Sequence, residues 1–414
     1  METTPDVCVV GLGYIGLPTA AILAANGSNV IGVDVNPHHV AEINAGRVPF
    51  VEPDLESVVA GVVAQGRLAA QSSVPHADAY IVAVPTPFTE TYEVDDAYVR
   101  AAADAIAPML KGGELIILES TSPPGLTEQM GEFILDARPD LTAAPGRANS
   151  VHFAHCPERV LPGRIMVEIV QNDRIIGGVT PEAAERARAL YATFCRGELL
   201  ITDARTSEMA KLAENSYRDV NIAFANELSM ICDRIDIDVW ELIRLANHHP
   251  RVNILQPGPG VGGHCIAVDP WFIVAAAPDR AKLIRLAREV NDSKPDFVLE
   301  KIMARAAKFR DPVIAALGIA FKADIDDLRE SPSKTIVERL ASELPHASIL
   351  VVEPNIDALP SDLAGRANVT LRETADAVEE ADVVVVLVDH QQFKAMDPRA
   401  LQEKVLVDTK GIFL

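Results

Sequence analysis

The thiol of Cys265 ends a glycine-rich segment, GPGVGGHC (residues 258–265), and Asp269 follows it four residues later. A thiolate is a nucleophile that can hold a carbonyl substrate covalently, and glycines let a backbone approach a ligand closely. This combination favours an oxidation in two steps, in which the thiol traps the product of the first step for the second. The alternative is a buried cysteine in a tight turn, where burial leaves the thiol inert.

A second glycine motif, GLGYIG (residues 11–16), predicts a nucleotide cofactor. Gly11, Gly13 and Gly16 follow a strand-like apolar run and open a helix, so backbone amides and the helix dipole can receive a pyrophosphate. Asp34 closes the next strand-like run, where a carboxylate accepts hydrogen bonds from ribose hydroxyls and repels a 2′-phosphate. The pattern favours NAD over NADP. The alternative is a glycine turn in an unrelated α/β fold, with Asp34 as a helix cap.

Hydroxyl-bearing turns follow two further predicted strands. VPTP (84–87) contains Thr86, and ESTSPPG (119–125) contains Thr121 and precedes Thr127. Because ligands bind at the carboxyl ends of parallel strands, these turns are expected near the nicotinamide. Proline-rich turns capped by Ser or Thr are also common in loops without a function, so the glycine motif carries this interpretation.

Charged side chains in two segments could form a pocket for an anion. CPERVLPG (156–163) offers Arg159 as a clamp for a phosphate or carboxylate and Glu158 as a base. In the helix expected near 206–234, Lys211, Asn215 and Arg218 share one face at i, i+4 and i+7. A cation such as Lys211 lowers the pKa of a neighbouring thiol. The alternatives are a surface ion pair and a solvated helix face.

Two later segments add further cations. Arg251 follows a His-His pair (248–249) just before the glycine-rich segment, and the pair lacks the third ligand that a metal site needs. GIAFKADIDDLRESP (318–332) ends a predicted strand, and its Lys322 and Arg329 are placed to contact a diphosphate. The alternative is a charged loop before a helix that begins at the Ser-Pro of this segment.

These segments need a frame that brings them together. From residue 7 to about 205, short β-branched runs alternate with helical stretches, the pattern of a parallel sheet with helices on both faces. Residues 206–310 are mostly helical, with breaks expected at the glycine-rich segment and at Pro295. Strand-like runs return beyond residue 311. The predicted fold is α/β, with two Rossmann-like doubly wound domains (1–205 and 311–414) joined by a central helical domain (206–310).

The expected strands share a β-branched or aliphatic composition and a turn signal at each end. They are 7–10, 29–33, 79–84, 115–118, 151–155, 174–176, 313–317, 348–352, 382–388 and 405–407.

Composition limits the partners. The formal charge of -22 opposes binding to nucleic acid or an anionic membrane, so an anion site must be a local basic pocket. The longest apolar runs, such as Val383–Val388, have strand length, and the N-terminus runs into a strand without a basic leader, so no membrane span or signal peptide is expected. Five cysteines without a CxxC pair or a zinc spacing favour neither disulfides nor a metal cluster, and a cytoplasmic location is expected.

The ordered set GLGYIG, VPTP, ESTSPPG, CPERVLPG, KLAENS, GPGVGGHC and GIAFKADIDDLRESP resembles the UDP-glucose/GDP-mannose dehydrogenase family over essentially the whole chain. The resemblance implies NAD-dependent oxidation of a UDP-sugar at C6 through a thiohemiacetal and a thioester on Cys265. The runs 214–227, 239–247 and 249–257 are similar to members that act on UDP-N-acetyl-D-mannosamine and supply a uronate for bacterial surface polysaccharide. The first domain would bind NAD, the central one would mediate dimerisation and carry the catalytic Lys and Cys, and the last would bind the UDP-sugar.

The resemblance also implies roles for individual residues. Cys265 would be the nucleophile and Lys211 the proton donor and acceptor, with Asn215, Asp269, Glu158 and Thr121 completing the catalytic set. The implied NAD contacts are Gly11, Gly13, Tyr14, Ile15, Gly16, Asp34, Thr86, Thr127 and Arg329. The implied UDP-sugar contacts are Arg159, Val160, Lys211, Asn215, Arg218, His249, Arg251, Gly262, Phe321 and Lys322. Members are dimers or larger homo-oligomers, and an Arg at the position of Arg251 can reach a neighbouring subunit's site.

One position departs from the family's pattern. UDP-glucose members often carry a second acid four residues after the Glu of the CPE segment, where this chain has Pro162, and this disfavours glucose. Oxidation of UDP-N-acetylglucosamine or another UDP-hexose stays an alternative. A one-step NAD-dependent hydroxy acid dehydrogenase would release one NADH rather than two, and a non-catalytic nucleotide-sugar sensor would release none.

Overall fold

The computed structural model describes residues 6–50, 52–89, 91–161, 163–263 and 266–413. The chain divides into two compact units, Met1–Glu214 and Asn215–Leu414, and each unit has its own sheet and hydrophobic core. The bounds of the three domains expected from the sequence stay predictions.

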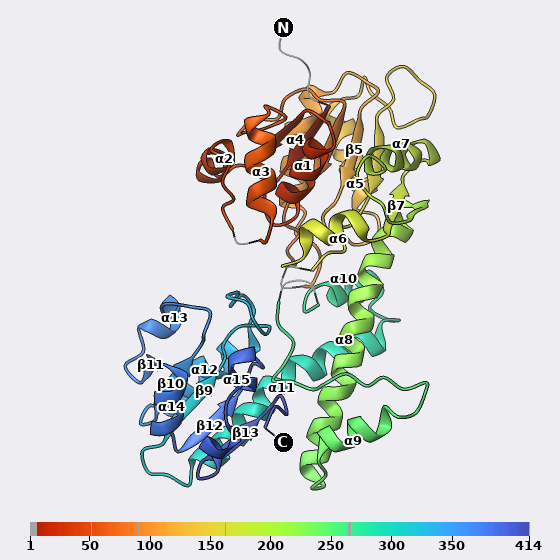
Figure 1. Ribbon diagram of the computed structural model, residues 1–414. Coiled ribbons are helices and arrows are strands. Elements are labelled where there is room, and N and C mark those ends of the chain that lie inside the picture. Colours follow the sequence, from red (N-terminus) through yellow and green to blue (C-terminus); the bar gives the residue numbers. More distant parts are fainter. Residues whose placement is uncertain (1–5, 51, 90, 162, 264–265, 414) are drawn as a thin grey trace. The chain divides into compact units, whose positions relative to one another are not determined.

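The first unit is built on a sheet whose eight described strands follow the order β3-β2-β1-β4-β5-β6-β7-β8 (Figure 1). Neighbouring strands are parallel except β6 and β7, which are antiparallel. Side chains of β1, β4, β5 and β6 are buried throughout, as expected for a sheet covered on both faces. The strands are β1 (Val7–Val10), β2 (Val30–Val33), β3 (Leu68–Gln71), β4 (Ala79–Val82), β5 (Leu115–Leu118), β6 (His152–His155), β7 (Arg174–Gly178) and β8 (Leu199–Asp203).

Helices cover both faces of this sheet because alternate residues of each strand point to opposite sides. Val9 and Ile81 belong to the cluster that includes buried residues of α1, α3 and α7, whereas Cys8 and Val82 pack with those of α4 and α5. The doubly wound arrangement brings the carboxyl ends of β1, β4 and β5 to one edge. The helices are α1 (Gly16–Ala25), α2 (Pro37–Asn44), α3 (Leu55–Ala64), α4 (Ala97–Ile106), α5 (Leu126–Ala137), α6 (Ile165–Gln171) and α7 (Pro181–Tyr191), with a 3-10 turn, η1 (Ala107–Met109), after α4.

A long helix, α8 (Ala204–Arg234), follows β8 and continues from the first unit into the second. The helical part of the second unit also contains α9 (Val239–Ala246), α10 (Asp269–Ala276) and α11 (Lys282–Ala306). Buried polar side chains join α8 to α11. Arg288 donates to Asp219 at 2.5 Å, and Asn226 donates to Asn291 at 2.9 Å.

Pro295 lies inside α11, so the break predicted at this residue is wrong. A proline removes one hydrogen bond of the helix and crowds the preceding turn. The turns that follow it, however, place Val298, Leu299 and Ile302 in the core of the second sheet. Burial of these side chains outweighs the local preference of a single residue.

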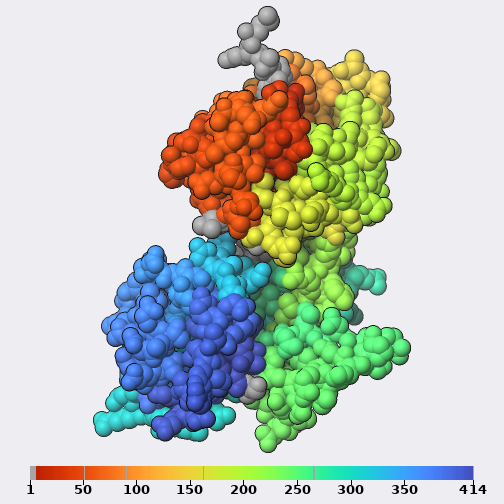
Figure 2. All heavy atoms as spheres, viewed as in Figure 1, coloured from red at the N-terminus to blue at the C-terminus, as the bar shows by residue number. Residues whose placement is uncertain are grey.

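The second sheet contains five described strands in the order β11-β10-β9-β12-β13, and all of its pairs are parallel. Helices α11 and α12 pack on one face through residues such as Ile336 and Leu340, and α14, α15 and η2 cover the other through residues such as Val378 and Phe393. Figure 2 shows the segments from α12 onward, coloured blue, as one continuous packed body. The elements are β9 (Val313–Leu317), α12 (Pro332–Glu343), β10 (Ser348–Val352), α13 (Ser361–Ala364), β11 (Val369–Leu371), α14 (Thr374–Glu380), β12 (Val383–Val386), α15 (Gln391–Lys394), η2 (Pro398–Leu401) and β13 (Val405–Asp408).

The predicted fold class is confirmed. Both units have parallel sheets with helices on both faces, and a helical segment separates the two sheets in the sequence. Strands β3, β8 and β11 were not predicted, and neither was the antiparallel pairing of β7 with β6. None of the described helices is both long enough and apolar enough to cross a membrane.

Candidate active site

The loop between β1 and α1 has the shape that a pyrophosphate needs. A Cβ on Gly11 would lie 2.4 Å from the Ala83 carbonyl oxygen, and one on Gly16 would lie 1.8 Å from the Gly11 carbonyl oxygen, so both glycines serve close packing. A Cβ on Gly13 would meet nothing within 4 Å. No described side chain caps the N-terminus of α1 at Ile15. Open space beside uncapped helix amides fits an anionic group, and the chain's own residues therefore fit a dinucleotide.

Asp34 lies at the end of β2 and is partly buried. It accepts a hydrogen bond from the Leu12 amide at 3.0 Å and one from the Asn36 amide at 2.8 Å. The carboxylate thus connects the glycine loop to the second strand, at the position where such an acid meets a ribose. Tyr14, within the loop, stacks on Phe50 with ring centroids 4.2 Å apart.

The turns after β4 and β5 meet at the carboxyl edge of the sheet. Thr86 donates to the Thr121 carbonyl oxygen at 2.7 Å, and Ser120 donates to the Val84 carbonyl oxygen at 2.6 Å. Thr127, in the first turn of α5, is fully buried, and its hydroxyl donates to Glu208 at 2.6 Å. The two predicted hydroxyl-bearing turns are therefore neighbours, and the roles of Thr86, Thr121 and Thr127 toward NAD or substrate stay predictions.

Two side chains of α8 that were not predicted from the sequence form hydrogen bonds with the carboxyl edge of the first sheet. Glu208 is fully buried and accepts hydrogen bonds from the Gly125 amide (2.6 Å) and the Thr127 amide (2.8 Å). Ser207 pairs with His155 Nδ1 at 2.9 Å. Lys211 follows one turn later and is half-buried, close enough to His155 for its charge to help burial lower the pKa of that imidazole to about 3.

The segment after β6 is held by a buried ion-pair cluster. Arg174 donates to Glu158 at 2.7 Å and lies 3.7 Å from Glu119, and all three side chains are buried. Burial, followed by the charge of Glu158, raises the pKa of Glu119 to about 7. Arg159 forms a two-pronged pair with Glu214 (2.7 and 3.1 Å). Val160 packs on the core of the first unit.

Buried cysteines in the first unit are held as neutral thiols. Burial raises the pKa of Cys8 and of Cys156 to about 12, which keeps thiolate scarce at neutral pH. The predicted nucleophile, Cys265, and the departing position, Pro162, lie outside the described residues.

In the second unit, Asn215 and Asp269 form a buried pair. Asn215 Nδ2 donates to Asp269 Oδ2 at 2.6 Å, and the two residues are 8% and 3% exposed. Asp269 is the first residue of α10, four residues after the predicted nucleophile. The structure thus brings together two of the predicted catalytic residues next to the thiol-bearing segment.

The glycine-rich segment packs against the segment 318–332. A Cβ on Gly262 would lie 2.5 Å from the Glu330 carbonyl oxygen, and one on Gly263 would lie 2.9 Å from the Phe321 ring. At its start, the Gly258 amide donates to Asn226 Oδ1 at 2.9 Å. Protein atoms thus occupy the space beside Gly262 and Gly263 where a side chain would lie, and the predicted approach of their backbone to a ligand stays a prediction.

The remaining predicted binding residues of the second unit lie at its surface. Arg218, His249, Arg251 and Lys322 are all exposed. Arg329 donates to Asp327 at 2.7 Å. Their contacts with a UDP-sugar or with NAD stay predictions. Among the described residues, no group of three or more His, Cys, Asp or Glu side chains is arranged to hold a metal ion.

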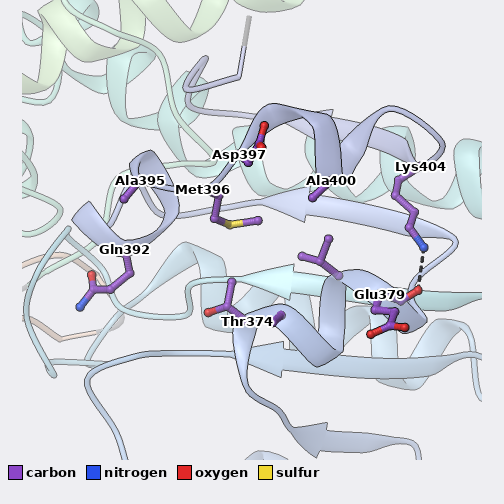
Figure 3. A pocket seen from close by; sticks show the side chains of 10 residues that line it. Thr374, Glu379, Gln392, Ala395, Met396, Asp397, Ala400 and Lys404 are labelled. Atoms are coloured by element: carbon purple, nitrogen blue, oxygen red, sulfur yellow. Dashed lines mark hydrogen bonds between the residues drawn. The ribbon is translucent and has the colours of Figure 1, made fainter.

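A cavity of about 580 Å³ lies in the second unit, between α14, α15 and the segment that follows them. Figure 3 shows Met396 and Ala400 beside it and Lys404 at its rim, where the ammonium donates to the Glu379 carbonyl oxygen at 2.7 Å. Its lining, within 374–404, includes none of the predicted site residues.

The chain is similar to known proteins along nearly its whole length. Models of the UDP-glucose/GDP-mannose dehydrogenase family match residues 5–195 (NAD binding domain), 205–293 (central domain) and 315–413 (UDP binding domain). A UDP-N-acetyl-D-mannosamine dehydrogenase of Yersinia pestis is 56% identical over 98% of this chain and 99% of its own length. An NDP-N-acetyl-D-galactosaminuronic acid dehydrogenase of Ralstonia nicotianae is also 56% identical, over 98% of this chain and 96% of its own.

Solved structures give the same result. A UDP-N-acetyl-mannosamine dehydrogenase from Staphylococcus aureus is 40% identical with a TM-score of 0.86, over 98% of this chain and 95% of that one. A UDP-glucose dehydrogenase from Pyrobaculum islandicum is 27% identical with a TM-score of 0.86, over 99% of this chain and 95% of that one. The glycine loop, the ordered motifs and these matches agree, and the protein is an NAD-dependent nucleotide-sugar dehydrogenase that belongs to the UDP-glucose/GDP-mannose dehydrogenase family.

Proposed function

We propose that the protein oxidises C6 of UDP-N-acetyl-D-mannosamine to the uronate in two successive steps and releases two NADH. The observation that carries this proposal is the buried pair of Asn215 and Asp269 at the start of α10, beside the segment of Cys265. Relatives named for this substrate, 54–56% identical over 98% of the chain, support the choice of sugar.

Residues of the first unit would hold the cofactor. The open side of Gly13 and the amides at the N-terminus of α1 suit the pyrophosphate, and Asp34 suits a ribose without a 2′-phosphate. Thr86 and Thr121, joined by their hydrogen bond, would lie near the nicotinamide. When bound, NAD accepts the hydride that each oxidation removes from C6.

The chain's own groups would move the protons and form the covalent bond. Lys211 would take the proton of the C6 hydroxyl as the aldehyde forms. The thiolate of Cys265 would then add to the aldehyde carbon, forming a C–S bond, and the oxyanion would take a proton to give a thiohemiacetal. Loss of the second hydride and of that proton would leave a thioester. Water would add to its carbonyl, the C–S bond would break, and the thiolate would be restored.

The proposed reaction balances in atoms and charge. One alcohol, two NAD⁺ and one water give one carboxylate, two NADH and three protons. Lys211 and Asn215 would donate to the oxyanion of each tetrahedral intermediate, and a single well-placed donor contributes about 3 to 4 kcal/mol. Asn215 is oriented for this task because its amide is fixed by Asp269.

A base is needed to activate the hydrolytic water, and the structure bears on the two candidates. Glu158 is buried in a pair with Arg174, so its position is fixed but its charge is already partnered. Asp269 is also buried, its Oδ2 accepts the hydrogen bond from Asn215, and it follows the predicted nucleophile by four residues. We therefore favour Asp269 for the water and a positioning role for Glu158 beside Arg159.

The UDP-sugar would meet the second unit where two predicted segments come together. Phe321 packs against Gly263, so the segment that carries Lys322 lies against the segment that ends at the thiol. A cation at Lys322 suits a diphosphate, and the contact with the glycine-rich segment would set the distance from the diphosphate to C6.

We also propose that two copies of the chain associate through α8. Its part in the second unit exposes Tyr217, Phe224 and Ile231 at i, i+7 and i+14, with exposed fractions of 72%, 50% and 48%. An apolar stripe on an exposed helix face is typical of a protein interface. The proposal extends to a cytoplasmic location and to a role of the uronate in surface polysaccharide, as the family resemblance implies.

The test is the stoichiometry of the reaction. The purified protein is incubated with NAD and, separately, with UDP-N-acetylmannosamine, UDP-N-acetylglucosamine, UDP-N-acetylgalactosamine or UDP-glucose, and NADH is counted per uronate. We expect two NADH per uronate and the highest kcat/KM with the mannosamine sugar. The Ralstonia relative's name favours the galactosamine sugar as second candidate.

A substitution separates covalent catalysis from simple hydride transfer. We expect Cys265→Ser to lower uronate formation by about a thousandfold or more, because a serine hydroxyl is far less nucleophilic than a thiolate. Cys195→Ser, at a partly buried thiol that contacts the Asn172 carbonyl oxygen, is the matched control and should keep wild-type activity. Uronate formation by Cys265→Ser at the wild-type rate would refute the covalent route.

A further inference from the structure

The first turn of α8 contacts two separate segments of the first unit through two adjacent side chains. Ser207 reaches His155 at the end of β6, and Glu208 reaches Gly125 and Thr127 at the start of α5. Both side chains are fully buried. We call this pair the α8 clamp.

Glu208 caps α5 from another helix. The carboxylate accepts from two main-chain amides and from the Thr127 hydroxyl, at 2.6 to 2.8 Å. Within the described part of the chain Glu208 forms no ion pair, so its charge is met by the amides at the positive end of the α5 dipole. Burial raises the pKa of Glu208, against the effect of these donors. Burial of a charged group costs stability, and the three hydrogen bonds to the Glu208 carboxylate offset that cost only while the contact with α5 is intact.

Ser207 completes the clamp through His155. The imidazole is fully buried between Ser207 at Nδ1 (2.9 Å) and the Ser120 carbonyl oxygen at Nε2 (3.3 Å). Burial lowers the pKa of His155 to about 3, so the ring is neutral and can bridge a hydroxyl and a carbonyl with one proton. Ser120 is next to Thr121, so this chain of contacts ends beside a predicted catalytic residue.

Lys211 lies on the same helix face as the clamp. It follows Glu208 by three residues and Ser207 by four, the spacings at which side chains on a helix are neighbours. The clamp therefore fixes the part of α8 from which Lys211 projects, and it fixes it against the turn that contains Thr121.

We propose that Ser207 and Glu208 are positioning residues for the oxidation, because they hold Lys211 in register with the Thr121 turn. This inference rests on the role proposed above for Lys211. It adds two residues that touch neither substrate nor cofactor and that act through the placement of the base. A shift of about 1 Å in a reacting group can lower a rate by about a hundredfold, so a loosened clamp should slow the chemical step.

The experiment uses the full-length protein with Glu208→Gln and Ser207→Ala. Glu208→Gln keeps the volume of the side chain but places an NH2 group next to the main-chain amides of Gly125 and Thr127, which are also donors. Ser207→Ala removes only the hydrogen bond to His155. We expect kcat to fall by about 10- to 100-fold for Glu208→Gln and by less for Ser207→Ala, with the Kd for the UDP-sugar unchanged. The kinetic isotope effect with C6-deuterated sugar should rise, because hydride transfer becomes slower relative to product release.

A surface pair between the same two helices provides the matched control. Arg205 on α8 donates to Glu128 on α5 at 2.6 Å, and their side chains are 65% and 35% exposed. Glu128→Gln should leave kcat and the isotope effect at wild-type values. Melting temperatures of all three variants separate a loss of folded protein from a loss of catalysis.

Several results would overturn the inference. Folded variants at both clamp positions with kcat within about twofold of wild type would do so. So would an equal loss in Glu128→Gln, or a fall in activity that follows the melting temperature with no change in the isotope effect. If Glu208→Gln does not fold, Ser207→Ala decides alone by the same criteria. Failure of the wild type to form NADH with any UDP-sugar would instead refute the proposed function.

Discussion

Gly13 and Gly16 of the GLGYIG motif have different surroundings. Substitution of each by alanine should therefore separate an effect on cofactor binding from an effect on folding. At Gly13 a new Cβ would meet no atom within 4 Å, whereas at Gly16 it would lie 1.8 Å from the Gly11 carbonyl oxygen. If the pyrophosphate occupies the open side of Gly13, Gly13→Ala should weaken NAD binding and leave the free protein as stable as before. Gly16→Ala should instead destabilise the fold, whether or not NAD is present.

The magnitudes follow from these contacts. A methyl group that displaces a pyrophosphate from its amide donors loses at least one charge-assisted hydrogen bond, about 1.5 to 3 kcal/mol, so the Kd for NAD should rise by about 10- to 150-fold. A contact of 1.8 Å with backbone forces the chain to move, which costs about 3 kcal/mol at the upper end of overpacking effects. For a unit of this size, that lowers the melting temperature by about 6 to 12 °C.

The assay combines an NAD titration by calorimetry with a thermal melt of each variant without NAD. The reasoning predicts a split result, in which Gly13→Ala changes only the Kd and Gly16→Ala changes the melting temperature. An unchanged Kd in Gly13→Ala would show that the pyrophosphate lies elsewhere. A strongly lowered melting temperature in the same variant would show that its Cβ is not in open space.

Two other substitutions test the electrostatics and the association. Glu119 binds its proton up to about pH 7 in the folded state and up to about pH 4.5 when unfolded, so its contribution lowers stability progressively as pH rises between these values. The melting temperature of Glu119→Gln, minus that of wild type, should therefore increase as pH rises across this window. A difference in melting temperature that is independent of pH would contradict the assignment. On α8, Phe224→Asp places a charge in the exposed apolar stripe and should shift a dimer toward monomer in analytical ultracentrifugation. Unchanged mass in Phe224→Asp would place the interface elsewhere.

Strands in the middle of each sheet were predictable because their side chains are buried on both faces. The strand predicted at 115–118 has the observed bounds, and the one predicted at 382–388 contains the observed strand Val383–Val386. Two of the three missed strands, β3 and β11, lack that signal. β3 has two alanines and a glutamine among its four residues, and β11 has three residues in all. Edge strands of this kind form because they pair with a neighbouring strand. The sequence of the segment itself does not reveal that neighbour.

In the candidate site, too, some contacts could be predicted from the sequence and others could not. Thr86 and Thr121 could be placed together in advance, because turns after adjacent parallel strands must meet at one edge of the sheet. Asn215 and Asp269 could be named but not joined, since 54 residues separate them in the chain. Glu208 was missed because nothing local marks a glutamate on one helix as the cap of another. The contacts of Gly262 and Gly263 with Glu330 and Phe321 were not predictable, because sequence cannot tell which atoms fill the space beside a missing Cβ.

Buried glutamates that accept main-chain amides recur in both units and explain part of the acidic composition. Glu52 accepts from the amides of Gly163 and Ile165, and Glu353 accepts from those of Ile319 and Ala320. Glu208 does the same for α5. In each case a carboxylate supplies the partner that a loop or helix start lacks, so the loop is fixed without regular structure of its own. The segments fixed in this way include those predicted to bind NAD and the UDP-sugar. These three buried glutamates therefore act on the predicted binding segments through the main chain, by accepting hydrogen bonds from their amides.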